Sequence, residues 1–152
     1  MSFNTKDFKR FEKQIILKKV GIAGQKKIKK SKVLIIGMGG LGCPLLTYLV
    51  SSGVNNIGIV DHDKVEISNL NRQILFNPSD IGKFKVTQAK NRMNNLYKNI
   101  NIKIFRERIS KKNIKTIFKN YEIVCDGTDN FESRYLINDE CKKNKKILIT
   151  AA

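Results

Sequence analysis

A glycine-rich segment carries the first sign of chemistry in this sequence. The run GMGGLG matches the pattern G-x-G-x-x-G at Gly37, Gly39 and Gly42, directly after the apolar run VLII. Small residues let the backbone approach phosphate groups, and a helix that begins there favours anions at its N-terminus. Asp61 ends a second apolar run, where a carboxylate can accept both hydrogen bonds of a ribose diol. The segment therefore predicts nucleotide binding. The alternative is a tight strand–helix turn without a ligand, with Asp61 as an ordinary loop residue.

Two further polar blocks favour ATP with magnesium over a nicotinamide dinucleotide. SNLNRQ supplies amides and Arg72 after the second apolar run, and DGTDN adds carboxylates after a later one. Six of the 13 acidic residues fall within 61–66 and 126–132. In so basic a chain, this concentration predicts one carboxylate for the ribose and another for Mg²⁺, with Arg72 and Lys85 neutralising a triphosphate. The glycine pattern by itself leaves an NAD-dependent oxidoreductase as the alternative.

Strands and helices alternate along the chain and would position these residues. Short apolar runs are typical of buried parallel strands, and the segments between them have helical periodicity. This alternation predicts an α/β, Rossmann-like, doubly wound parallel sheet behind an N-terminal helical extension. We divide the chain into a helical arm, residues 1–30, and an ATP-binding domain, residues 31–152. The expected strands are 33–37, 57–61, 102–105, 122–126 and 147–150, and the expected helices are 6–18, a short basic one ending near 30, 41–52, 86–96, 114–118 and 130–144.

Composition argues against several classes of protein. The formal net charge is +17, but the excess is mostly lysine spread along the chain without interleaved aromatic residues, so we expect no nucleic-acid partner. No apolar run approaches membrane-spanning length, and the charged N-terminus does not resemble a signal peptide. Three scattered cysteines suit a reducing cytoplasm. We interpret Cys43, Cys125 and Cys141 as packing or surface residues and assign no role to His62.

Five segments together closely resemble the ThiF/MoeB adenylyltransferases, which are bacterial relatives of the ubiquitin-activating enzymes. They are KRFEKQIIL, VLIIGMGGLGCP, IVDHDKVEISNLNRQILF, IGKFKV and CDGTDNFESRYLIND, in the family's order and spacing. The resemblance implies adenylation of the C-terminal glycine of a ubiquitin-like sulfur-carrier protein, as in thiamine or molybdopterin biosynthesis. It implies ATP and Mg²⁺ as cofactors. Attack of the carrier carboxylate on the α-phosphorus would need alignment and charge neutralisation rather than a protein nucleophile.

The same resemblance implies roles for single residues. Gly40 matches the position near the nucleotide phosphates, Asp61 the ribose-binding acid and Lys85 the phosphate-contacting lysine. Asp129 matches the magnesium-site aspartate, and Asn130 its neighbour in the nucleotide site. The alternatives without a ligand are that Asp129 caps the following helix and that Lys85 and Arg72 are ordinary surface residues. The loop expected to wrap ATP consists of Ser68, Asn69, Leu70, Asn71 and Arg72.

Two departures from the family pattern bear on function. The family's N-terminal motif R-Y-x-R-Q becomes RFEKQ, so Lys13 stands where an arginine reaches the partner subunit's site, with Arg10 as a substitute. The family's crossover loop, further strands, CxxC zinc motifs and catalytic cysteine have no counterpart in these residues. We therefore expect the C-terminal half of the family fold to be missing and no zinc in this chain. We also expect a homodimer in the full-length form, and weak Mg-ATP binding, self-association and little adenylation by this chain alone. The second function considered is an inactive or regulatory nucleotide-binding remnant that acts through dimerisation.

Overall fold

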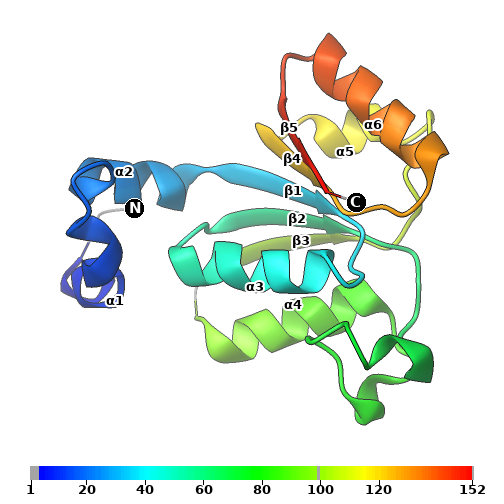
Figure 1. Ribbon diagram of the computed structural model, residues 1–152, viewed down its shortest axis with the longest axis horizontal. Helices are drawn as coiled ribbons and strands as arrows, with labels where there is room; N and C mark the ends of the chain where they lie inside the picture. Colours follow the sequence, from blue (N-terminus) through cyan, green and yellow to red (C-terminus); the bar gives the residue numbers. More distant parts are fainter. Residues whose placement is uncertain (1–3, 99, 152) are drawn as a thin grey trace.

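The N-terminal arm is a pair of helices packed at one end of a sheet. The computed structural model describes residues 4–98 and 100–151. Helix α1, Thr5–Ile15, begins at Asn4, whose side chain forms a capping box with Asp7. Helix α2, Gly21–Lys30, is joined to it by an ion pair between Lys29 Nζ and the Asp7 carboxylate at 2.7 Å. In Figure 1 both helices lie beside the start of β1, far from the tips of the strand arrows.

Five parallel strands form one sheet in the order β3-β2-β1-β4-β5. Their apolar, β-branched residues suit strands that are covered on both faces. The order reverses direction next to β1, and ligands of such sheets bind at this switch point, beyond the carboxyl ends of the strands. The strands are β1, Lys32–Ile36; β2, Asn56–Val60; β3, Asn101–Phe105; β4, Ile123–Asp126; and β5, Ile147–Thr150.

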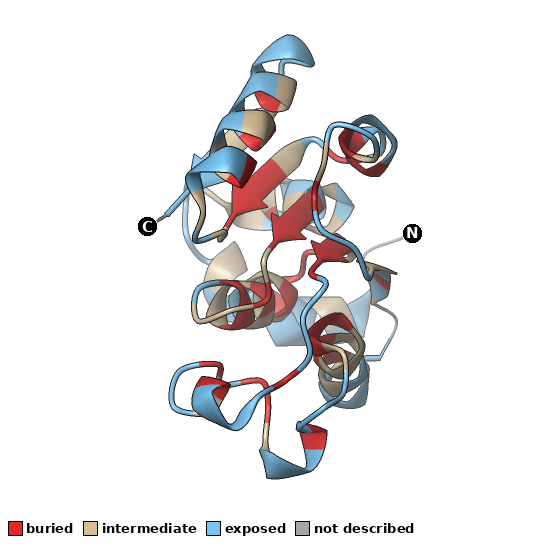
Figure 2. Cartoon of the chain, turned by 90° about the vertical axis from the view of Figure 1, so that its right-hand side faces the viewer, coloured by how far each residue is buried: buried red, intermediate tan, exposed pale blue. Residues whose placement is uncertain are grey.

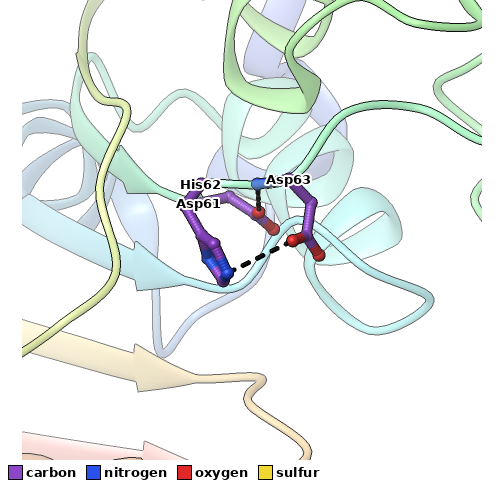
Figure 3. Close-up of side chains that lie close together, drawn as sticks. All are labelled: Asp61, His62 and Asp63. Atoms are coloured by element: carbon purple, nitrogen blue, oxygen red, sulfur yellow. Dashed lines mark hydrogen bonds and ion pairs between the residues drawn. The ribbon is translucent and has the colours of Figure 1, made fainter.

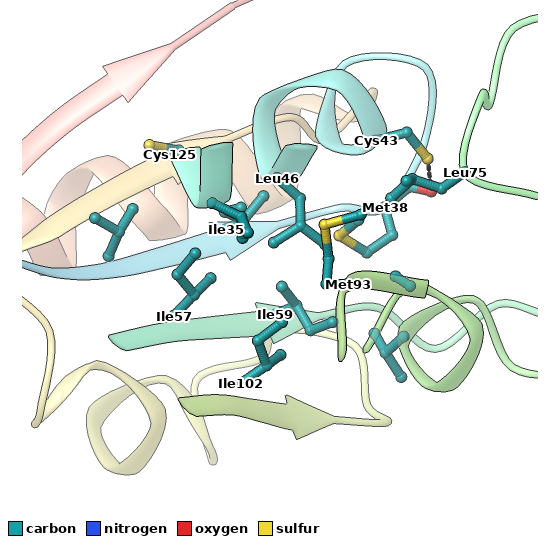
Figure 4. Close-up of a cluster of buried hydrophobic side chains, with 14 of the residues drawn as sticks. Ile35, Met38, Cys43, Leu46, Ile57, Ile59, Leu75, Met93, Ile102 and Cys125 are labelled. Atoms are coloured by element: carbon teal, nitrogen blue, oxygen red, sulfur yellow. Dashed lines mark hydrogen bonds between the residues drawn. The ribbon is translucent and has the colours of Figure 1, made fainter. Parts of the chain in front are cut away.

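Helices cover both faces of the sheet and create two apolar cores (Figure 1). Helices α3, Gly42–Ser52, and α4, Lys85–Leu96, cover one face, and α5, Ile114–Phe118, and α6, Phe131–Lys143, cover the other. Figure 4 shows isoleucines of β1, β2 and β3 packed against Leu46 of α3 and Met93 of α4. Buried residues accordingly concentrate on the central strands and the inner sides of the helices (Figure 2).

These observations confirm the predicted doubly wound parallel sheet, with most element ends within two residues of expectation. One boundary, at the end of the first helix, differs by more than this. The first helix ends at Ile15 rather than at 18, and Phe8 on this helix is 46% exposed. β5 is an edge strand of the sheet, and its Ile147 is 60% exposed. Within the described ranges, no helix is long and apolar enough to cross a membrane.

Candidate nucleotide-binding site

The glycine loop turns tightly between β1 and α3. Gly37 has φ of +91°, and its N–H donates to the carbonyl of Val60 at the end of β2. A Cβ on Gly42 would lie 1.9 Å from the carbonyl oxygen of Gly37, so only glycine fits there. At Gly40, by contrast, a Cβ would meet Arg72 at an ordinary contact distance of 3.5 Å. Gly42 is therefore required by the turn itself, whereas the space beside Gly40 is available to a ligand.

Asp61 fixes this loop from the end of β2. The side chain is 9% exposed, and its two oxygens accept the N–H groups of Met38 at 2.7 Å and Asp63 at 2.8 Å. Each carboxylate oxygen has a second lone pair, so both can still accept a hydrogen bond from a ligand hydroxyl. The residue thus has a structural role in the loop in addition to the predicted role towards a ribose.

An open cleft of about 990 Å³ lies at the carboxyl ends of β1, β2 and β4. It gathers most of the residues that the sequence singled out, from segments as far apart as the glycine loop and α6. Those that line it are Gly37, Gly39, Gly40, Asp61, Asn69, Arg72, Lys85, Asp129 and Asn130. Gly42, Ser68, Leu70 and Asn71 are not among its lining residues.

The loop after β2 supports Arg72 on one wall of the cleft. The Arg72 guanidinium donates from Nη1 to the carbonyl of Ser68 at 2.9 Å and to the side-chain oxygen of Asn71 at 3.2 Å. Asn69 is buried, and its side-chain oxygen accepts the N–H of Glu66, which stabilises the short 3₁₀ turn Ile67–Asn69. Leu70 packs against the core beneath. Ser68, Leu70 and Asn71 therefore shape the loop, and its arginine faces the cleft.

Lys85 begins α4 and extends into the cleft from a buried position. It is 6% exposed, and its Nζ lies 3.0 Å from a carboxylate oxygen of Asp63. This burial is inconsistent with the alternative of an ordinary surface lysine.

The loop after β4 forms the opposite wall. The buried carboxylate of Asp126 accepts the backbone N–H and the hydroxyl of Thr128 at 2.9 and 2.7 Å, which folds the loop back on the strand. The cap of α6 is Asn130, whose side chain accepts the N–H of Ser133 at 2.9 Å. The alternative that Asp129 caps this helix is wrong. Asp129 instead presents an exposed carboxylate at the cleft.

Charge in the cleft is balanced, although the whole chain carries +17. Hard carboxylate oxygens beside several cations suit a polyphosphate bound together with Mg²⁺, because Mg²⁺ takes oxygen ligands from carboxylates and phosphates. Five lining residues are acidic and five are basic, namely Asp61, Asp63, Glu66, Glu107 and Asp129, and Lys64, Arg72, Lys85, Arg108 and Arg134.

The cluster of Asp61, His62 and Asp63 could in principle hold a metal ion, but its existing contacts argue against this. Asp61, His62 and Asp63 bring ligand atoms within 4.8 Å of one another (Figure 3). However, both Asp61 oxygens already accept N–H groups, and Asp63 contacts both Lys85 and the imidazole of His62 at 3.0 and 3.3 Å. These positive and N–H partners oppose a cation. The exposed carboxylate of Asp129 lies on the other wall of the cleft.

Several residues of the site, among them Asp63, Arg134 and Gln73, were given no role from the sequence. Asp63 pairs with Lys85, and Arg134 of α6 donates to the carbonyl of Thr128 at 2.8 and 3.1 Å. Gln73 lines the cleft beside Gly39, is 3% exposed, and has a side-chain oxygen without a partner among the described residues. The sequence offered a clue to two of them, because Asp63 lies two residues after Asp61 and Gln73 directly follows Arg72. The contacts that these residues make arise only in the folded chain.

Arg10 and Lys13 lie outside this cleft. The Arg10 guanidinium donates to the carbonyl of Val50 at 3.0 Å, near the C-terminal end of α3, and stacks on Tyr97 with 4.5 Å to the ring centroid. The glycine loop is at the opposite end of that helix. Lys13 is exposed on α1. Within one copy of the chain, neither residue contributes to the nucleotide site.

The three cysteines are buried and free, which confirms their interpretation as packing residues. Burial raises the pKa of Cys43 and of Cys141 to about 11, and it also raises the pKa of Cys125. Thiols in this state are poor nucleophiles at neutral pH.

Solved structures with the same fold include proteins that were crystallised with nucleotides. E. coli tRNA N6-threonylcarbamoyladenosine dehydratase TcdA, solved with ATP, is 21% identical and superposes with a TM-score of 0.91 over 99% of this chain and 61% of its own. E. coli MccB, solved with AMPCPP and MccA, is 29% identical with a TM-score of 0.79 over 84% of this chain and 39% of its own. Because TcdA is only 21% identical to this chain, its superposition shows the fold alone.

Sequence comparison gives the family. The sulfur carrier protein adenylyltransferase of Thermus thermophilus is 38% identical across the whole chain, and the probable molybdopterin-synthase adenylyltransferase of Porphyra purpurea is 42% identical over 99% of it. The chain spans 56% and 40% of the lengths of these two relatives. The profile of the ThiF family matches residues 11–152, which include the glycine loop, both walls of the cleft and every strand. The chain belongs to the ThiF family.

Proposed function

We propose that this chain binds Mg-ATP and forms the nucleotide-binding part of an adenylyltransferase that activates a ubiquitin-like sulfur carrier. The observation that carries the proposal is the single cleft that joins the glycine loop, Asp61, Arg72, Lys85 and Asp129. The names of the relatives as sulfur-carrier and molybdopterin-synthase adenylyltransferases support the choice of reaction and partner.

Different residues of the cleft would contact the ribose, the phosphates and Mg²⁺. Asp61 would accept the ribose hydroxyls, and the backbone near Gly40 would approach the phosphates. Arg72 and Lys85 would neutralise the phosphate oxygens, and Asp129 would hold Mg²⁺, which supplies further charge neutralisation when bound. Asn130 sets the direction of the Asp129 loop because it caps α6.

The proposed reaction is transfer of an adenylyl group to a carboxylate. An oxygen of the carrier's C-terminal glycine forms a bond to the α-phosphorus while the bond from that phosphorus to the bridging oxygen breaks. Pyrophosphate leaves with the electron pair, and the product is an acyl-adenylate. No proton transfer is needed at the nucleophile, so positioned positive charge accounts for the catalysis that the chain's own residues provide.

Helix α1 would contribute to the nucleotide site of a second copy of the chain. Lys13 is exposed on α1, a helix that lies far from the tips of the strand arrows in Figure 1, as expected of a residue that serves a partner's site. In a homodimer, Lys13 would add a cation to the neighbouring cleft, whereas Arg10 is occupied with Val50 and Tyr97.

The test measures binding first and chemistry second. Titration calorimetry with Mg-ATP, Mg-ADP, AMP and NAD should give heat for the adenine nucleotides with Mg-ATP tightest. Carrier-dependent exchange of labelled pyrophosphate into ATP then tests adenylation, with a carrier lacking its C-terminal glycine as control. ATP binding with little exchange is the expected result, robust exchange would show that this chain suffices for adenylation, and preferential binding of NAD would overturn the assignment.

A further inference from the structure

We infer that Asp63 is a positioning residue that holds the Lys85 ammonium in place for a polyphosphate ligand. The inference rests on the proposed nucleotide-binding function and adds a residue to it. Asp63 belongs to the loop after β2, whereas Lys85 begins α4, so the two are brought together only by the fold.

Asp63 holds Lys85 at two points. Its carboxylate Oδ2 lies 3.0 Å from Lys85 Nζ, and its backbone carbonyl accepts the N–H of Lys85 at 3.0 Å. The second bond fixes the first residue of α4, and the first bond fixes the end of a side chain with four rotatable carbons. An ordinary ion pair between two surface side chains has only the first of these constraints.

The same residue connects Lys85 to the glycine loop. The N–H of Asp63 donates to Asp61 Oδ1 at 2.8 Å, and Asp61 Oδ2 accepts the N–H of Met38 at 2.7 Å (Figure 3 shows the first contact). A continuous chain of hydrogen bonds therefore runs from the glycine loop through Asp61 and Asp63 to Lys85. The positions expected at the ribose and at the phosphates are set by one network.

Lys85 is more deeply buried than Asp63, which indicates that Asp63 stabilises Lys85 rather than the reverse. The side chain of Lys85 is 8% exposed, and that of Asp63 is 50% exposed. An ammonium group in a buried position needs a counter-charge, whereas a half-exposed carboxylate is solvated without one. Lys85 has three N–H donors, of which the contact with Asp63 uses one, so donors remain for phosphate oxygens.

A double-mutant cycle tests whether Asp63 acts through Lys85. The variants are Asp63→Asn, Lys85→Met and the double variant, each titrated with Mg-ATP and with AMP. Asp63→Asn should weaken Mg-ATP about tenfold and AMP less than about twofold, because only ATP has distal phosphates. In the Lys85→Met background, the same change should alter Mg-ATP affinity by less than about twofold, because its effect has already been lost.

Asp7→Asn is the matched control, because the Asp7 carboxylate also pairs with a lysine and accepts the backbone N–H of Asn4, but in the N-terminal arm. It should leave both affinities unchanged. Thermal unfolding checks each variant, and Asp63→Ser, whose side chain cannot reach Nζ, replaces Asp63→Asn if the latter does not fold.

The outcomes separate this inference from the proposed function. Wild-type protein that binds no Mg-ATP overturns both. Wild-type binding with an undiminished Asp63 effect in the Lys85→Met background, equal losses for ATP and AMP, or tighter ATP binding by Asp63→Asn overturns the inference alone. The last result would mean that Asp63 withholds Lys85 from the ligand.

Discussion

The carboxylate of Asp61 accepts the backbone N–H of Met38 at 2.7 Å and so ties the end of β2 to the glycine loop after β1. Met38 is fully buried, so this N–H has no access to water. The residue expected to recognise the ribose is therefore also part of the scaffold.

Asp61→Ala should both destabilise the chain and abolish nucleotide binding. An unsatisfied buried N–H at Met38 should lower the free energy of unfolding by about 1–3 kcal/mol, measured by urea denaturation. Calorimetry with Mg-ATP should give no measurable heat. Asp129→Ala is the control for stability, because its exposed carboxylate should leave the urea midpoint unchanged. An Asp61→Ala variant with wild-type ATP affinity would disprove the ribose assignment.

Arg72→Ala should weaken ATP much more than AMP. The guanidinium is held by Ser68 and Asn71 on the cleft wall, where it would reach distal phosphates. We expect about a tenfold loss of Mg-ATP affinity and less than about a twofold loss for AMP, from one charge-assisted contact. Arg92→Ala, which removes an arginine that is not among the cleft's lining residues, is the control. Equal losses for both nucleotides would place Arg72 away from those phosphates.

Substitution by alanine should affect stability differently at two glycines of the loop. Gly42→Ala puts a methyl group against the Gly37 carbonyl and should cost about 3 kcal/mol or more in unfolding free energy. Gly40→Ala has room for its methyl group beside Arg72, so its unfolding curve should match wild type. Its Mg-ATP affinity should nevertheless fall, because the methyl group occupies the approach to the backbone. Unchanged ATP binding by Gly40→Ala would argue against phosphates at this position.

Stability should decline at alkaline pH because of the buried thiols. Burial raises the pKa of Cys43 from 9.0 to about 11, so the unfolded chain loses this proton at a lower pH than the folded chain. The contribution is complete below pH 9 and is lost as the pH rises towards 11, at about 1.4 kcal/mol for each pH unit. Urea midpoints from pH 7 to 11 should show a shallower decline in Cys43→Ala than in wild type. Parallel curves for the two proteins would contradict the buried, protonated thiol.

Local patterns predicted most of the fold, because β-branched apolar runs and helical spacing are properties of neighbouring residues. The run Ile147–Thr150 has the same local pattern as the central strands, and its exposure follows from its position at the edge of the sheet. Phe8 is exposed for a similar reason. The helical spacing is correct, but the arm packs on the rest of the chain through Phe11, which lies against Gly53.

The candidate site was predictable where a motif has fixed spacing and obscure where contacts come from tertiary packing. The positions of Asp61 and Arg72 follow from the motifs, whereas the pairing of Asp63 with Lys85 joins a loop to a helix that begins 22 residues later. Asn130 and Asp129 are adjacent and both suit a helix cap by residue type. Only the backbone geometry shows that Asn130 caps α6 and leaves Asp129 for the cleft.

The contrast between a neutral cleft and a chain of charge +17 has a consequence for how fast a ligand arrives. A polyanion far from the protein is attracted by the summed lysine field, whereas a polyanion inside the cleft meets equal numbers of both signs. Association should therefore be rapid and slow steeply as salt screens the field, while dissociation, governed by short contacts, changes little. Any polyanion is drawn to this surface at low ionic strength, so discrimination among them falls to how long each one stays.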